Sequence, residues 1–183
     1  MRSRLSVIIP LLLGACSFDP TVRDAFHSEL VSPYRLDSGD RLRIIVFGQD
    51  DLTNTYAVDQ AGNVTMPLIG AVAARGRSTP EVEAEVSARL LNGYVRNPDV
   101  SVEIDQYRQF FAMGEVSAGG QYAFVPGMTV QQAIAVAGGF TARADKASVQ
   151  VTRSIEGQVA TARLKLSDPV LPGDTLYVRE RIL

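Results

Sequence analysis

Residues 108–141 read RQFFAMGEVSAGGQYAFVPGMTVQQAIAVAGGFT, and this stretch decides the fold of the second half of the chain. Two apolar runs, 110–116 and 121–125, flank the turn signal Ser-Ala-Gly-Gly, which predicts a β-hairpin. Thr129 can cap the helix that follows, whose apolar residues recur at i, i+3, i+4 and i+7. Gly138 should end this helix, because glycine reaches the left-handed conformation without steric cost. A hairpin, a helix and further strands predict a β-grasp module.

The rest of the second unit, residues 107–178, continues as short strands between turns. Alternating apolar residues and turn residues predict strands at 148–153, 159–166 and 175–178. Gly173-Asp174 before the last strand repeats Gly39-Asp40 before the first strand of the chain. Glycine supplies the bend and aspartate can bond nearby N–H groups, so the two pairs predict a shared way of turning into a strand.

The first unit, residues 33–106, combines strands with one helix. Strands are expected at 41–47, 55–58, 63–66, 71–75 and 100–105, with turn 59–62 joining two paired strands. Ser78 and Glu81 fit a capping box, which predicts a helix that Gly93 ends. The unit therefore reads as a small α+β domain.

The N-terminus has the pattern of a bacterial lipoprotein signal. Arg2 and Arg4 precede an apolar run, 5–13, that is too short to cross a bilayer core of about 30 Å. Leu-Gly-Ala-Cys at 13–16 resembles a lipobox and predicts cleavage between Ala15 and Cys16. Residues 1–15 would then be a signal peptide, Cys16 a lipidated N-terminus and 16–32 a tether. By resemblance to sorted lipoproteins, Ser17 favours the outer membrane.

Composition excludes several classes of site. The 183 residues carry a net charge of -2 with no basic bias, so no nucleic-acid partner is expected. A single Cys and a single His exclude an internal disulfide and zinc sites built from several such ligands. A Ser-His-Asp triad would depend on His27, which lies in a polar stretch near the N-terminus. We expect no catalytic residue, no metal and no cofactor.

Two groups of side chains allow a structural and a functional interpretation. Five aspartates lack the ligand spacing of a calcium loop and lie where turns use aspartate: Asp37, Asp40, Asp50, Asp51 and Asp59. Four aromatic residues could form a sugar-stacking surface: Phe110, Phe111, Tyr122 and Phe124. Because side chains alternate along a strand, at least half of these rings should lie in the core.

An ordered set of motifs resembles the bacterial outer-membrane polysaccharide export lipoproteins. In the first unit the motifs are Tyr34-Arg35-Leu36, Gly39-Asp40, Val46-Phe47-Gly48, Val58-Asp59, Pro67-Leu68-Ile69-Gly70 and Pro98 with Val100. In the second they are Gly114-Glu115-Val116, Val125-Pro126-Gly127-Met128-Thr129-Val130, Ala137-Gly138-Gly139 and Leu171-Pro172-Gly173-Asp174. The resemblance implies an α+β fold, with a mixed-sheet polysaccharide export domain followed by a single soluble-ligand-binding β-grasp domain and a tail, 179–183.

The resemblance also implies a function and partners. Such proteins export capsular polysaccharide or exopolysaccharide as homo-oligomeric rings, with no cofactor. They work with an inner-membrane polysaccharide co-polymerase that carries a tyrosine kinase or its relative. A lipid on Cys16 would hold this chain at the periplasmic face of the outer membrane. Within such a ring, residues 108–141 would contact a neighbouring subunit or another partner.

The chain departs from the larger members of that family at its end. They carry further β-grasp domains and a C-terminal amphipathic helix, whereas five residues follow Val178 and a spanning helix needs about 20. We therefore expect a periplasmic ring, with a separate outer-membrane pore protein completing the exit. The alternative is a glycan-binding or scaffold lipoprotein that does not form the conduit. A glycan hydrolase would need a carboxylate pair across a cleft, and the acids offer no candidate pair.

Overall fold

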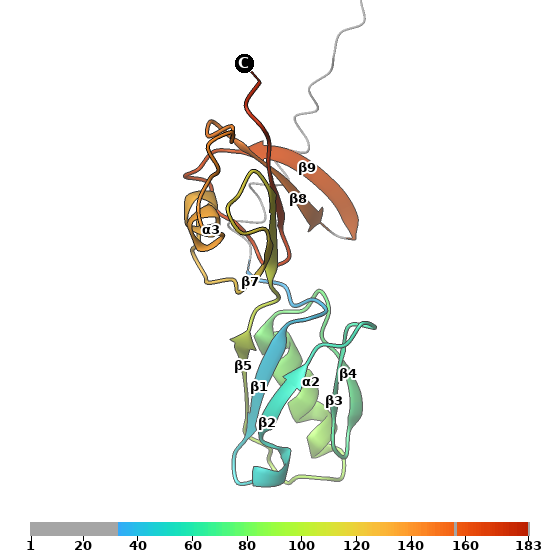
Figure 1. Cartoon of the computed structure of the whole chain (residues 1–183). Helices are drawn as coiled ribbons and strands as arrows, with labels where there is room; N and C mark the ends of the chain where they lie inside the picture. Colours follow the sequence, from blue (N-terminus) through green and yellow to red (C-terminus); the bar gives the residue numbers. More distant parts are fainter. Residues whose placement is uncertain (1–32, 156, 183) are drawn as a thin grey trace, which may run out of the picture.

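Two separate hydrophobic cores divide the chain into two α+β domains. The computed structural model describes residues 33–155 and 157–182, so the predicted cleavage and lipidation site, Ala15 and Cys16, lies outside the described residues. One core contains Leu36, Leu42 and Leu90, and the other contains Phe110 and Leu176. In Figure 1 the first domain, blue to green, lies below the second, yellow to red. The α+β fold class is confirmed.

The first domain is built on a three-stranded antiparallel sheet in the order β2-β1-β5. Its strands are β1 (Arg41–Val46), β2 (Asn54–Ala57) and β5 (Val100–Gln106), and a 3-10 helix, η1 (Asp50–Leu52), joins β1 to β2. Leu42, Ile44 and Val46 alternate with more exposed residues, which gives β1 one buried face.

One predicted strand pairing was wrong. Turn 59–62 forms, and Asn63 N–H donates to Asp59 Oδ1 at 2.8 Å, but the strands on its two sides do not pair. Strand β2 pairs with β1, whereas β3 (Asn63–Met66) pairs with β4 (Gly70–Ala73) in a separate two-stranded sheet. A turn signal indicates where the chain reverses, while the choice of neighbour depends on which apolar faces meet in the core.

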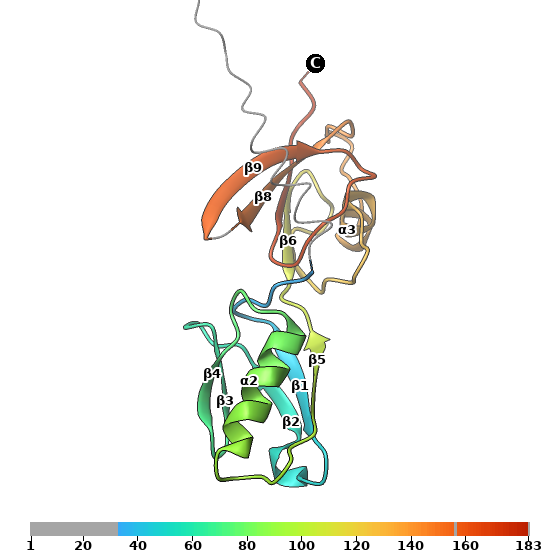
Figure 2. The ribbon, with the colours of Figure 1, turned by 180° about the vertical axis from the view of Figure 1, so that it is seen from behind.

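Helix α2 (Thr79–Leu91) covers one face of these strands, as Figure 2 shows. The predicted capping box forms, with Ser78 N–H donating to Glu81 Oε2 at 2.6 Å. Val82, Val86 and Leu90 lie one turn apart and are fully buried. Burying each such side chain contributes about 1.5–3 kcal/mol, so this face attaches the helix to the sheet. Among the described residues, no helix is both long and apolar enough to cross a membrane.

The second domain has a five-stranded mixed sheet in the order β7-β6-β10-β8-β9. The strands are β6 (Phe110–Gly114), β7 (Gly120–Tyr122), β8 (Val149–Ile155), β9 (Gln158–Leu164) and β10 (Thr175–Val178). Strand β10 runs parallel to β6, and the other pairs are antiparallel. Helix α3 (Val130–Val136) follows the first hairpin and buries Val130, Ala133 and Ile134. The predicted hairpin and helix are therefore present.

Candidate functional site at the domain junction

The carboxylate of Asp40 lies at the centre of the hydrogen bonds that join the two domains. Asp40 has no solvent exposure and closes the turn that leads into β1. Its carboxylate accepts from Asp37 N–H at 2.9 Å, and its own N–H donates to the Asp37 carbonyl at 3.1 Å. Gly39 within the turn has a φ of 94°, which glycine adopts easily.

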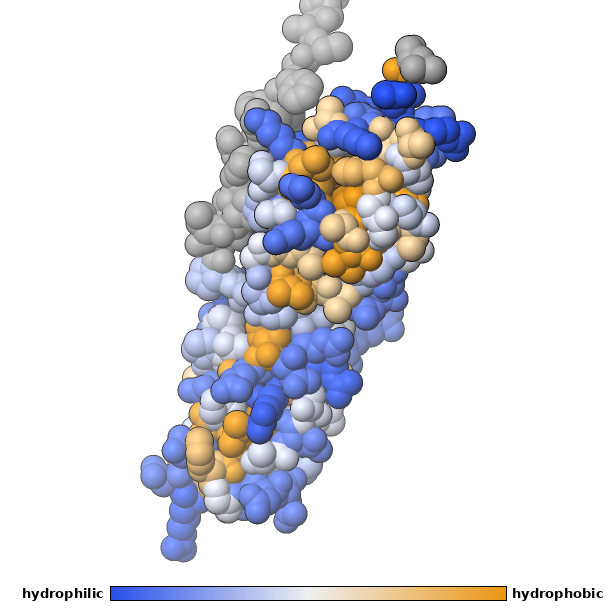
Figure 3. Space-filling view, turned by 60° about the vertical axis from the view of Figure 1, so that its left-hand side comes forward, coloured by the Kyte–Doolittle hydropathy of each residue, from blue (hydrophilic) through white to orange (hydrophobic). Residues whose placement is uncertain are grey.

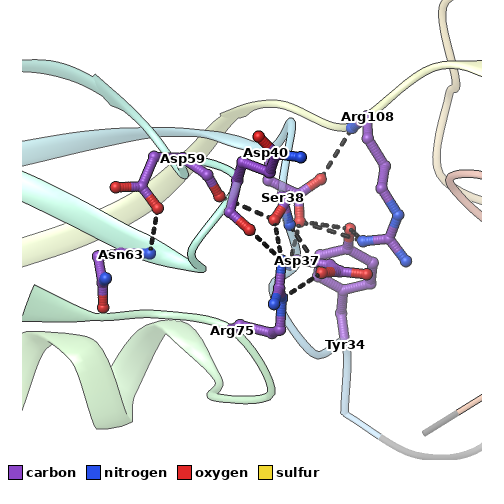
Figure 4. A network of polar contacts seen from close by, with 9 residues as sticks. Tyr34, Asp37, Ser38, Asp40, Asp59, Asn63, Arg75 and Arg108 are labelled. Atoms are coloured by element: carbon purple, nitrogen blue, oxygen red, sulfur yellow. Dashed lines mark hydrogen bonds and ion pairs between the residues drawn. The ribbon is translucent and has the colours of Figure 1, made fainter. Parts of the chain in front are cut away.

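Arg108 connects this turn to the second domain (Figure 4). Its backbone N–H donates to Asp40 Oδ1 at 2.8 Å, and its guanidinium lies 3.3 Å from Asp40 Oδ2. Tyr34 OH donates to the same Oδ2 at 2.7 Å and accepts from Arg108 Nη1 at 2.8 Å. Because a buried carboxylate is costly without partners, this network stabilises the junction in one arrangement.

Burial raises the pKa of Tyr34 well above its ordinary value of 10.0. The charge and hydrogen bond of Asp40 act in the same direction, while the Arg108 guanidinium opposes them. Tyr34 is therefore neutral at physiological pH and keeps the proton that it donates to Asp40.

Aromatic rings continue the contact between the domains. Tyr107 lies edge-to-face with Tyr34 of the first domain, at 5.0 Å between ring centroids, and with Phe124 of the second domain, at 5.5 Å. Such pairs contribute about 0.5–1.5 kcal/mol beyond the area that they bury. Tyr107 thus joins the domains alongside the ion pair.

The Gly173-Asp174 turn repeats the geometry of the first turn, as the sequence predicted. Leu171 N–H donates to Asp174 Oδ2 at 2.8 Å, and Asp174 N–H donates to the Leu171 carbonyl at 3.2 Å. Asp174 is also fully buried, and Arg153 binds its two oxygens at 2.8 Å each. Each turn therefore begins a strand, and each pairs its aspartate with an arginine.

Arg108 lies between the two turns. A Cβ atom on Gly173 would come within 2.7 Å of Arg108 Nε, and a Cβ atom on Gly39 would lie 3.4 Å from Arg108 Cβ. The turns of both domains thus approach one arginine side chain, and a side chain at residue 173 would require the end of Arg108 to shift.

A cleft of about 470 Å³ lies beside this network. Its lining includes Gln106, Gln109, Gln121, Tyr107 and Phe111, and in the part of the chain that the structure describes Arg108 is its one charged side chain. The residues offer hydrogen-bond donors and acceptors and aromatic surface, which suits an uncharged polar ligand. Within the described part of the chain, no group of three or more potential metal ligands occurs.

Three of the five aspartates that the sequence singled out serve turns, as expected: Asp37, Asp40 and Asp59. Asp37 accepts from Ser38 N–H at 2.8 Å and pairs with Arg75 at 3.0 Å, and Asp59 accepts from Asn63 N–H. Asp40 does more than the turn requires, because it also binds Tyr34 and Arg108. Asp50 and Asp51 belong to η1 and take no part in the junction network.

Of the four candidate stacking rings, one is well exposed. Phe110 is fully buried, Tyr122 and Phe124 pack against the core, and the exposed fraction of Phe111 is 40%. Sequence reasoning missed Arg108 and the three glutamines of the cleft. The two-residue spacing of Gln109 and Phe111 was a local signal for Gln109 alone.

Comparison with known proteins agrees with this two-domain organisation. Residues 28–105 match the family model described as polysaccharide biosynthesis/export protein, and residues 113–161 match the SLBB domain.

Three relatives are the exopolysaccharide production protein ExoF of Rhizobium meliloti (strain 1021), the EPS I polysaccharide export outer membrane protein EpsA of Ralstonia solanacearum and the polysialic acid transport protein KpsD of Escherichia coli. ExoF is 33% identical over 61% of this chain and 29% of its own length. EpsA is 30% identical over 67% of this chain and 39% of its own length. KpsD is 26% identical over 73% of this chain and 24% of its own length. The chain thus spans well under half the length of these relatives. It belongs to the polysaccharide biosynthesis/export family and joins that family's domain to an SLBB domain.

Proposed function

We propose that this protein takes part in the export of a capsular polysaccharide or exopolysaccharide, as a ring-forming component at the periplasmic face of the outer membrane. The observation that carries the proposal is the order of an export domain and an SLBB domain in one chain. Relatives that match most of the chain are named for exopolysaccharide production, outer-membrane export or polysialic acid transport.

The junction geometry supports the assembly part of the proposal. A closed ring needs the same angle between neighbouring copies at every contact, and a chain of two domains meets that need when its domains are braced. Asp40, Tyr34 and Arg108 supply such a brace. In Figure 3 apolar residues gather on the second domain, while the first domain is mostly hydrophilic on this face. Exposed apolar side chains within 108–141 include Val125 and Val136, which would suit a subunit contact.

The anchor in this proposal is Cys16. Cleavage after Ala15 and lipidation of Cys16 would hold the ring at the membrane, because two or more acyl chains give stable anchoring. A Cys16→Ala variant should leave the outer-membrane fraction and retain its signal peptide, as the mass of the intact protein would reveal. Mature, membrane-bound protein from this variant would contradict the lipoprotein assignment.

The partners follow from the same role. An inner-membrane co-polymerase with a tyrosine kinase would deliver the polymer, and a separate outer-membrane protein would complete the exit. The ring itself would be a passive, polar conduit, because a channel that binds its cargo tightly cannot release it.

A gene deletion tests the function. Surface polysaccharide should disappear while lipid-linked precursor is still made, and the wild-type gene on a plasmid should restore export. The functional proposal is wrong if the deletion strain displays a normal amount of surface polysaccharide.

A second candidate function is a glycan-binding or scaffold lipoprotein that does not form the conduit. The polar cleft at the junction favours a binding role, since it offers amide groups and an aromatic ring. Negative-stain images of the detergent-solubilised protein separate the two functions. Rings support the conduit, and a stable monomer supports the binding protein.

A further inference from the structure

We propose that the junction cleft is a weak binding site for an uncharged, hydroxyl-rich stretch of a glycan chain, with Phe111 as the platform on which a sugar ring stacks. The identity of this ligand as the exported polymer rests on the proposed function, whereas binding in the cleft can be measured independently. The cleft volume of about 470 Å³ lies within the range of about 300–1,000 Å³ for small-ligand sites.

The strand register places Phe111 beside the amide side chain of Gln121. Phe111 on β6 lies opposite Gln121 on β7, and Gln109 lies two positions before Phe111, just ahead of β6. All three residues line the cleft. Aromatic rings bind the apolar C–H face of a sugar, and flanking amides can bond its hydroxyl groups.

The glutamines are available for a ligand. Within residues 33–155 and 157–182, the side chains of Gln106, Gln109 and Gln121 form no hydrogen bond. A side-chain amide both donates and accepts, as a sugar hydroxyl does, so the chemistry of the two groups is complementary.

Charge favours a neutral ligand. Among the described residues, Arg108 is the only charged one that lines the cleft, and Asp40 lies 3.3 Å from its guanidinium and compensates its charge. A site for an anionic ligand would present uncompensated cationic groups. The lining therefore suits sugar hydroxyls better than carboxylates or phosphates.

The outer face of the sheet extends the cleft into a track for a longer chain. One row of paired residues crosses all five strands: Gln121, Phe111, Thr175, Thr152 and Thr161. Thr152 and Thr161 hydroxyls lie 3.1 Å apart at the far end of this row. A ligand longer than the cleft can thus continue over hydroxyl groups, as a polymer requires and a small metabolite does not.

The absence of tryptophan from the chain allows a direct test. We would replace Phe111→Trp in the full-length protein in detergent, so that the only indole lies in the cleft. Maltohexaose at millimolar concentrations should shift the emission wavelength of this indole and change its fluorescence intensity, and both effects should saturate. The matched control is Tyr94→Trp, because Tyr94 is an exposed aromatic residue of the first domain that does not line the cleft. An F111W response that is absent, or equal to that of Y94W, overturns the proposal.

A second pair of variants tests the amides. Gln109→Ala in the F111W background should weaken maltohexaose binding by about two- to tenfold, the effect of losing one hydrogen bond. Gln131→Ala, an exposed glutamine on α3, should leave binding unchanged. Equal binding by both double variants would remove Gln109 from the site and overturn the arrangement proposed here. A response to oligogalacturonate alone would overturn the assignment to uncharged sugars.

The fluorescence measurement and the gene deletion test two different proposals, and either proposal can be refuted while the other stands. A deletion strain with normal surface polysaccharide refutes the export function, and a saturable F111W response would still support a glycan site in the cleft. Conversely, lost export in the deletion strain together with a silent F111W variant leaves the function standing and refutes the site.

Discussion

At the scale of single residues, Asp40 and Arg108 determine how the two domains meet. Asp40 is fully buried and its carboxylate is bonded by Asp37, Tyr34 and Arg108. Removing one partner of a buried ion pair leaves a charge without compensation, which costs more than the net contribution of the pair itself. The Arg35–Glu81 pair differs, since both of its side chains are about half exposed.

Replacing Arg108→Met should therefore destabilise the protein strongly. We expect the free energy of unfolding to fall by about 3 kcal/mol, the lower end for a broken buried pair, because Arg108 retains 22% side-chain exposure. Arg35→Met, the matched control, should cost less than about 1 kcal/mol. Urea denaturation measures both, and similar losses in the two variants would contradict the role of the junction pair.

The raised pKa of Tyr34 predicts that the folded protein loses stability at alkaline pH. Because burial raises this pKa above 10.0, the folded state holds the proton more tightly than the unfolded chain. The resulting stability is present below about pH 10 and is lost as the pH rises above that value. Tyr34→Phe should lower stability by about 1 kcal/mol at neutral pH and give a flatter profile between pH 9 and about pH 11.

Thermal unfolding at several pH values tests this prediction. The control Tyr94→Phe removes the hydroxyl of an exposed tyrosine and should keep the wild-type profile. If Tyr34→Phe loses stability above pH 10 as steeply as the wild-type protein does, the alkaline transition belongs to another group.

At the scale of elements, the two Gly-Asp turns have the same geometry, each leads into a strand, and both approach Arg108. Gly173 illustrates the constraint, because it combines a φ of 84° with a Cβ position 2.7 Å from Arg108 Nε. Gly127 has a similar φ of 81° and nothing within 4 Å of its Cβ position. Alanine substitutions at Gly127 and Gly173 therefore distinguish the cost of backbone strain from the cost of a clash with Arg108.

Gly127→Ala should cost about 1–2 kcal/mol, the penalty of a left-handed conformation for alanine. Gly173→Ala should cost about 1–3 kcal/mol more, because Arg108 must move away from Asp40. Combined with Arg108→Met, the extra cost of Gly173→Ala should largely disappear, as expected for residues in contact. An additive double variant, measured by urea denaturation, would show that the turn does not act on Arg108.

At the scale of the whole molecule, the junction couples two cores that are otherwise separate. Leu42→Ala removes a fully buried side chain from the first core and should cost about 2–5 kcal/mol. In the otherwise wild-type protein, hydrogen exchange should increase for amides of both β1 and β8. With Arg108→Met added, the increase should be confined to the first domain, because the coupling is lost.

Faster exchange in β8 caused by Leu42→Ala in the Arg108→Met background would contradict this mechanism of coupling. Leu176→Ala is the reciprocal control in the second core, since Leu176 is also fully buried. It should affect β8 first and β1 only through the intact junction.

Across these scales, local signals were read correctly and distant contacts were not. The predicted capping box at Ser78 and the predicted cap at Thr129 depend on residues within one helical turn, and both form. The supposed pairing across turn 59–62 failed because β2 and β3 join different sheets. The resemblance of ordered motifs identified the family, which the domain matches confirm.

The sequence by itself determined the helices, the turns, most of the strands and the order of the domains, because each depends on neighbours along the chain. Only the tertiary structure decided that Arg108 meets Asp40, a residue 68 positions away, and that Gly173 faces the same side chain. It also decided that Phe111 and three glutamines line one cleft. The physical reason is that hydrogen-bond and packing preferences act within a few residues, whereas a binding surface is assembled from segments that folding brings together from distant parts of the chain.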